Sequence, residues 1–218
     1  MSNPASHDSA PPRRSLWLLL SAAAGILMLN MGARQSLGLF VAPLDAHRPL
    51  TLVEISFAFA VSQLMWGVAQ PVFGALVERW GSFRVILLGS MMVASGTALT
   101  PFATHSLMLT LSLGFLAAAG AGAGSFSILI GWLANYLPEN KRALSAGIIN
   151  AGASLGQFIF APLTQWLIDG WGWVMALEVL ALTALLVIPL AALLAHQTSG
   201  APKLDQGPAV PIPLRVQL

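Results

Sequence analysis

Long apolar stretches alternate with short polar breaks along this chain. Six stretches contain no Asp, Glu, Lys or Arg: 16–33, 55–77, 85–104, 106–138, 143–168 and 179–195. The first continues through Arg34 to Val41, and the last begins near Trp173 and includes Glu178. About 20 apolar residues span a bilayer as a helix, and an open strand would leave backbone groups unpaired in lipid. The pattern therefore predicts an all-α membrane protein with six transmembrane helices.

The same pattern divides the chain into three regions. We expect a polar cytoplasmic tail over 1–14, a six-helix transmembrane bundle over 15–195, and a flexible cytoplasmic linker over 196–218. The linker region holds four prolines, which is typical of an extended segment.

Composition and charge agree with a lipid environment. Hydrophobic residues make up 56% of the 218 residues and charged residues 8%, against about 25% charged in a soluble domain. If the N-terminus is cytoplasmic, the cytoplasmic segments hold eight basic residues and the outer loops hold only Arg48. The positive-inside rule then predicts both termini in the cytoplasm and a multi-pass protein of the inner (plasma) membrane. A cleaved export signal in "RRSLWLLLSAAAG" is the alternative, but the apolar stretch continues beyond it.

Two segments of the chain resemble each other weakly. "PVFGALVERWG" begins at Pro71 and "PLTQWLIDGWG" at Pro162, and the offset of 91 residues corresponds to three spans. Copies three spans apart point in opposite directions across the membrane, as in an inverted repeat of three helices. Shared helix-end chemistry without common ancestry is the alternative interpretation.

A short motif between the second and third spans carries a family resemblance. "GALVERWGSFR" contains Gly74, Glu78, Arg79, Gly81 and Arg84. It resembles the G-x-x-x-D-R-x-G-x-R signature of the major facilitator superfamily, with Glu in place of Asp and a single basic residue after the second glycine. The resemblance implies half of a twelve-helix fold, built as a 3+3 inverted repeat, and a gating role for these five residues. A simple cytoplasmic turn is the alternative.

Other segments resemble one branch of that superfamily. "MGARQSLGLFVAPL", "WLANYLPENKRALSAG" and "GIINAGASLGQFIFAPL" are similar to the monocarboxylate and oxalate/formate transporters. The fourth span reads "LSLGFLAAAGAGAG" and lacks the Arg common in many sugar and drug transporters. The resemblance therefore favours a small organic anion as substrate.

Arg34 is the candidate anion-binding residue. It lies about 27 Å along a helix that begins at Leu16, where a charge needs a cavity or a partner. Its planar guanidinium matches a carboxylate, and Asn30 lies one turn below on the same face. A structural ion pair with Asp45 or Glu178, or an outward-reaching side chain, is the alternative.

Polar residues also follow the second and fifth spans. Ser56, Gln63 and Gln70 recur every seven residues, and Asn150 begins a similar series in the fifth span. These amides can line a cavity or bond helices together. Gln63 and Asn150 are our candidate substrate contacts.

Several other features have structural interpretations. Gly120 and Gly124, like Gly152 and Gly156, have the spacing of helix-packing faces rather than a nucleotide loop. Thr51 and Glu54 form a predicted capping box. Glu178 is a weaker proton-site candidate.

The sequence thus predicts the N-terminal half of a secondary transporter for a small organic anion such as a monocarboxylate, oxalate or formate. We expect no enzyme activity, no cofactor, no metal and no nucleic acid. The expected partners are the substrate, the bilayer, and a missing C-terminal six-helix half or a second subunit. Drug or metabolite efflux is one alternative, and a truncated six-helix membrane protein without transport activity is another.

Overall fold

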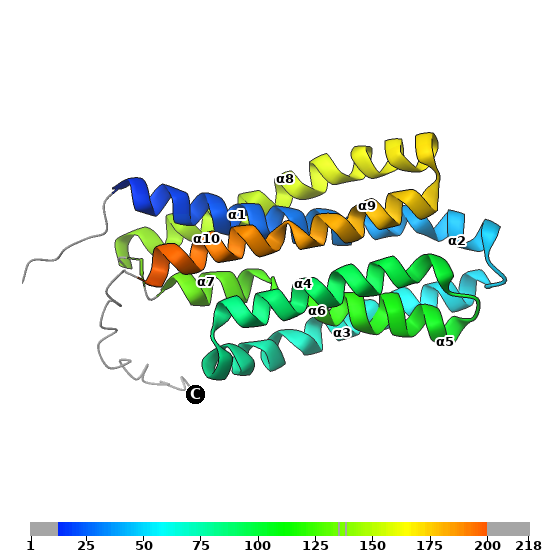
Figure 1. Cartoon of the computed structure of the whole chain (residues 1–218), viewed down its shortest axis with the longest axis horizontal. Coiled ribbons are helices and arrows are strands. Elements are labelled where there is room, and N and C mark those ends of the chain that lie inside the picture. Colours follow the sequence, from blue (N-terminus) through cyan, green and yellow to red (C-terminus); the bar gives the residue numbers. More distant parts are fainter. Residues whose placement is uncertain (1–12, 135, 138, 200–218) are drawn as a thin grey trace, which may run out of the picture.

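Six helical spans lie side by side along one axis in the computed structural model, which describes residues 13–134, 136–137 and 139–199 (Figure 1). The spans are long and apolar enough to cross a membrane, as the hydrophobic pattern predicts. They cover Leu16–His47, Leu52–Trp80, Ser82–Phe102, Ser106–Ala134, Asn140–Trp171 and Trp173–Ser199. Most of the predicted N-terminal tail (1–14) and most of the predicted linker (196–218) lie outside the described residues, and α1 already begins at Arg13.

Several spans contain more than one helical element. The elements are α1 (Arg13–Ser36), η1 (Leu37–Phe40), α2 (Val41–His47), α3 (Leu52–Trp80), α4 (Ser82–Leu99), η2 (Thr100–Phe102), α5 (Ser106–Leu109), η3 (Thr110–Ala117), α6 (Ala118–Ala123), α7 (Phe126–Ala134), α8 (Glu139–Trp171), α9 (Trp173–Leu185) and α10 (Val187–Ser199). Helix α10 continues four residues beyond the expected boundary at 195. The hydroxyls of Thr198 and Ser199 donate to carbonyls one turn earlier in this last turn.

Local sequence signals explain where α3 begins. The Thr51 backbone N–H donates to Glu54 Oε2 over 2.8 Å, and the Glu54 N–H donates to Thr51 Oγ1 over 3.3 Å. This reciprocal pair satisfies two backbone donors that the first turn of a helix leaves open. The predicted capping box is therefore confirmed, and it accounts for Glu54 without a role in proton coupling.

The order of helix packing follows an internal symmetry. Helix α1 packs on α8, α3 packs on η3 and α6, and α4 packs on α9. The first span of each three-helix repeat therefore meets the second span of the other repeat, and the two third spans meet each other. Since successive spans alternate in direction, this arrangement confirms the predicted 3+3 inverted repeat.

Two glycines mark the same place in both repeats. Gly81 has φ 81° and ψ 153°, and Gly172, 91 residues later, has φ 85° and ψ 159°. Within the described chain they are the residues with positive φ. Each follows a long helix that ends in Trp, at Trp80 and Trp171. The matching backbone turns at this offset support a true repeat over a chance similarity of helix ends.

Glycine seams set how closely the helices approach. A Cβ on Gly152 would lie 2.4 Å from the Ala24 carbonyl oxygen, and one on Gly156 would lie 2.1 Å from that of Met28. A Cβ on Gly120 would lie 2.6 Å from the Gly89 carbonyl oxygen of α4. These contacts confirm the predicted packing role of the small residues, because any side chain would force the backbones apart.

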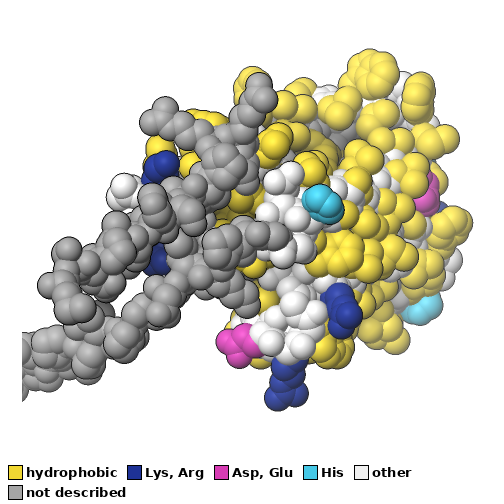
Figure 2. Space-filling view, turned by 60° about the vertical axis from the view of Figure 1, so that its left-hand side comes forward, with side chains coloured by type: hydrophobic (Ala, Val, Ile, Leu, Met, Phe, Trp, Pro, Cys, Tyr) yellow, Lys and Arg dark blue, Asp and Glu magenta, His cyan; other side chains and the backbone are white. Residues whose placement is uncertain are grey.

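The outer surface suits a lipid environment. Many large apolar side chains are exposed, including Phe57, Phe115, Phe158 and Trp166. Figure 2 shows hydrophobic side chains covering the flank of the bundle, with few charged groups among them. Spans α3 and α8 are the least buried of the six. They therefore offer the largest surfaces to lipid or to another protein segment.

Candidate functional site

Arg34 connects the first and second spans through its side chain. It lies in the last turn of α1, and its Nη2 donates a hydrogen bond to Gln63 Oε1 of α3. The guanidinium carbon lies 4.4 Å from the ring centroid of Trp66, one turn further along α3. A cation over an indole face is attracted by the ring, more strongly where water is excluded.

Two donors in this cluster have no acceptor. Arg34 Nε and Trp66 Nε1 are buried and lack a hydrogen-bond partner within the described residues. A buried donor without a partner costs about 1–3 kcal/mol, and more when the group is charged. An oxygen-rich anion beside the cluster would supply the acceptors, because a carboxylate offers several lone pairs.

A small, mostly apolar cavity lies inside the bundle next to Arg34. It has a volume of about 30 Å³, and Asn30, Ser62, Ser90 and Thr97 contribute polar groups to its lining. This volume exceeds the ~10–15 Å³ that one water needs but is small for an organic anion. Gln63, on the other side of the cluster, has an exposed side chain.

Asn30 has a structural contact of its own. Its Nδ2 donates to the Ala121 carbonyl oxygen of α6 over 2.9 Å. A Cβ on Gly124 would lie 2.3 Å from the same Nδ2. Asn30 therefore ties the first span to the fourth while its side chain also lines the inner cavity.

Asn150 lies far from Arg34 along the axis of the bundle. The register of α8 on α1 places Gly152 against Ala24 and Gly156 against Met28. In this register Asn150 lies beside Ala22 of α1. Ala22 precedes Arg34 by twelve residues, so Asn150 and Arg34 are about 18 Å apart along the helix axis at ~1.5 Å per residue. Its side chain is exposed on α8. The six-helix bundle therefore brings Arg34, Gln63 and Asn30 together and leaves Asn150 apart.

The groups that contact Arg34 differ from those of the alternative ion-pair interpretation. That alternative paired Arg34 with Asp45 or Glu178, whereas the structure places the amide of Gln63 and the indole of Trp66 against the guanidinium. Trp66 was absent from the candidate residues. The sequence could have indicated Trp66, because it lies three residues after Gln63 and residues three apart share a helix face.

The turn from Gly74 to Arg84 lies at the end of the bundle where the described chain begins and ends (Figure 1). Glu78 and Gly74 line a hollow of about 590 Å³ beside α7. Arg79 and Arg84 line a neighbouring hollow of about 520 Å³. Glu78 and Arg79 are exposed at the end of α3. The turn thus presents its acid and its two basic residues to different surfaces.

Arg48 forms a second contact between a cation and an aromatic ring, at the opposite end of the bundle. Its Nη2 donates to the Pro101 carbonyl oxygen, and its guanidinium carbon lies 5.3 Å from the Trp173 ring centroid. These contacts tie the first loop to the third and sixth spans. Arg48 is therefore a structural counterpart to Arg34.

The described residues contain no group of three His, Asp or Glu side chains placed to hold a metal ion. The candidate functional groups in this part of the chain are therefore the Arg34 cluster and the turn from Gly74 to Arg84.

Comparison with known proteins agrees with this architecture. The profile of the Major Facilitator Superfamily matches residues 18–216. The chain is 32% identical over 178 residues to monocarboxylate transporter 11 of Mus musculus, covering 82% of this chain and 39% of that protein. It is 28% identical over 163 residues to the oxalate:formate antiporter of Oxalobacter formigenes, covering 75% of this chain and 38% of that protein. The chain belongs to the major facilitator superfamily.

A solved structure shares the fold. A bacterial homologue of the human lysosomal transporter Spinster, in an inward-facing and unoccupied conformation, superposes with a TM-score of 0.69 at 18% identity. The match covers 94% of this chain and 47% of that one. The chain thus spans about two fifths of the curated relatives and about half of the solved transporter.

Proposed function

We propose that this six-helix unit is the N-terminal half of a secondary transporter that moves a small organic anion, such as a monocarboxylate, oxalate or formate. The names of the relatives and the chemistry of the Arg34 cluster support this substrate class. The main structural support is a pair of buried donors, Arg34 Nε and Trp66 Nε1, which have no acceptor in the described chain.

Arg34 is the proposed anchor for the substrate carboxylate. Gln63 Oε1 accepts from Arg34 in the present arrangement, and a carboxylate is a stronger acceptor because its hydrogen bonds to a cation are charge-assisted. Asn30 supports the anchor from the inner cavity. Asn150, about three turns lower, is a proposed contact for a substrate further along the path.

Alternating access requires one half to rock against another around a shared site. The exposed α3 and α8 are the proposed faces toward a C-terminal six-helix half or a second subunit. The turn with Gly74, Glu78, Arg79, Gly81 and Arg84 is the proposed gate at the cytoplasmic end. This assignment places both termini in the cytoplasm and the protein in the inner membrane.

Binding of oxalate, formate and lactate to the purified full chain tests the anchor. Tryptophan fluorescence reports on the site because Trp66 lies against Arg34. We expect Arg34→Gln to lower the affinity at least tenfold, and Arg34→Lys to restore part of it, because Lys keeps the charge without the planar fork.

Arg48→Gln is the matched control, since it also removes a guanidinium stacked on a tryptophan. It should leave anion binding unchanged. Equal binding by Arg34→Gln and the parent would refute the anchor role. Uptake of the same labelled anions, with a second six-helix half supplied, then separates a transporter from a membrane protein without transport activity. Preferential binding of amphipathic cations would favour efflux of a drug or metabolite instead.

A further inference from the structure

A basic hollow lies beside the turn that joins α3 to α4. It has a volume of about 520 Å³ and is bounded by that turn, the end of α7 and the end of α10. Arg79 and Arg84 line it, and its described lining contains no carboxylate. Glu78 lines the neighbouring hollow instead. The segregation of charge makes this hollow electropositive.

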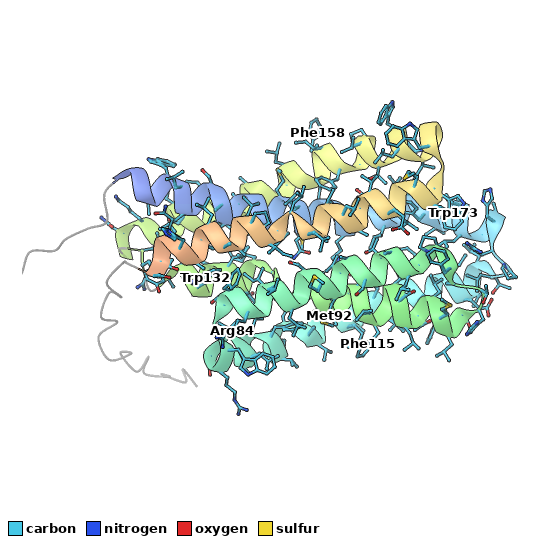
Figure 3. All side chains as sticks on the ribbon, viewed as in Figure 1. Arg84, Met92, Phe115, Trp132, Phe158 and Trp173 are labelled. Atoms are coloured by element: carbon cyan, nitrogen blue, oxygen red, sulfur yellow. The ribbon has the colours of Figure 1, made fainter. Side chains whose placement is uncertain are left out.

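Aromatic side chains line the hollow together with the two arginines. Trp80, Trp132 and Tyr136 contribute to the lining, and Trp80 is 51% exposed. Figure 3 places Arg84 and Trp132 at the same end of the bundle. Tryptophan and tyrosine favour the depth of the lipid headgroups, because their rings are both apolar and polar. The hollow therefore lies where a bilayer presents phosphates.

Apolar surface continues from the hollow along the helices. Leu88 lies one turn beyond Arg84 on α4, and Met91 follows it; both side chains are exposed. Leu193 is exposed on α10, which packs against α4. A molecule with an anionic head and long hydrocarbon chains could contact both the basic hollow and the apolar surface beside it. A soluble phosphate would contact only the basic hollow.

We propose that the hollow lined by Arg79 and Arg84 binds the phosphate headgroup of an anionic phospholipid, with its acyl chains lying against α4 and α10. A Lys or Arg near the surface contributes about 1 kcal/mol to the attraction of anionic lipid. This corresponds to about a fivefold change in affinity for each arginine.

Native mass spectrometry of the full chain tests this site. The chain is released from micelles that contain equal amounts of phosphatidylglycerol and phosphatidylcholine. We expect retained phosphatidylglycerol to exceed phosphatidylcholine. Arg84→Gln and Arg79→Gln should each lower its retention about fivefold, and Arg84→Lys should preserve it because the charge remains.

Lys141→Gln is the matched control, since Lys141 is a basic residue at the same end of the bundle and does not line the hollow. It should retain lipid like the parent. Equal retention of the two lipids by the parent, or unchanged retention in both arginine variants, overturns the site. Displacement of the lipid by millimolar glycerol phosphate would identify a soluble phosphate site and would also overturn the lipid assignment. Circular dichroism checks that each variant is folded. The lipid comparison uses no carboxylate anion, so its outcome is independent of the proposed transport.

Discussion

Asn30 donates a hydrogen bond to the backbone carbonyl of Ala121, the residue 91 positions later in the chain. The repeat has the same offset, so Ala121 is the counterpart of Asn30 in the second repeat. The bond therefore joins equivalent positions of the two repeats at the centre of the bundle. Gly124 makes room for this contact, because any side chain there would meet the Asn30 amide.

Gly124→Ala should destabilise the bundle. The new Cβ would lie 2.3 Å from Asn30 Nδ2, so the amide or the helix must move. Forced packing of this kind costs about 1–3 kcal/mol. Thermal unfolding of the full chain in detergent measures the loss. Gly131→Ala in the same span is the control, because a Cβ there meets nothing within 4 Å. Equal midpoints for the two variants would contradict the role of the Asn30 contact.

Gly156→Ala should separate α8 from α1. A Cβ at this position would lie 2.1 Å from the Met28 carbonyl oxygen, which is backbone and cannot swing away. We expect a loss of at least about 2 kcal/mol, near the upper end of overpacking effects. Gly147→Ala lies on the same helix in open space and serves as the control. The unfolding midpoints of the two variants are compared. A Gly156→Ala midpoint equal to that of Gly147→Ala would show that α8 and α1 are farther apart than the 2.1 Å contact implies.

Gly81→Ala and Gly172→Ala should have similar effects on stability. Both positions hold φ values above 80°, where an L-residue with a Cβ is strained. Each substitution should cost about 1 kcal/mol or more. Unfolding in detergent compares them with Gly170→Ala, which lies in α8 with open space around its Cβ. A large effect at one glycine and none at the other would argue against equivalent turns.

Trp66→Phe should separate the two contributions of Trp66 to anion binding. Phenylalanine keeps a ring for the Arg34 guanidinium and removes the indole N–H. If that N–H donates to the anion, its loss weakens binding by about 1 kcal/mol, or roughly fivefold. Trp66→Leu should weaken binding further because the cation also loses the ring. Isothermal titration of the parent and variants with oxalate measures these changes. Unchanged affinity in both variants would exclude Trp66 from the site.

Much of the fold was predictable because lipid imposes simple rules on sequence. The six spans follow from apolar length, and the start of α3 follows from Thr51 and Glu54. The three-helix repeat is visible in the prolines, tryptophans and glycines that recur 91 residues apart. The candidate site was less predictable. Arg34 and Gln63 are hydrogen-bonded to each other, a contact that the sequence did not predict. Trp66 was missed, and Asn150 lies about three turns from Arg34.

The sequence by itself determined that this chain spans a membrane six times, with a basic residue in the second half of its first span. These features can be predicted from sequence because lipid requires every backbone group to be hydrogen-bonded within a helix. A charge inside a span also stands out, because it needs a partner there. Only the tertiary structure decided what faces Arg34 and how far Asn150 lies from it. Those relationships depend on helix register and rotation, which contacts such as Gly152 on Ala24 fix between residues distant in the chain.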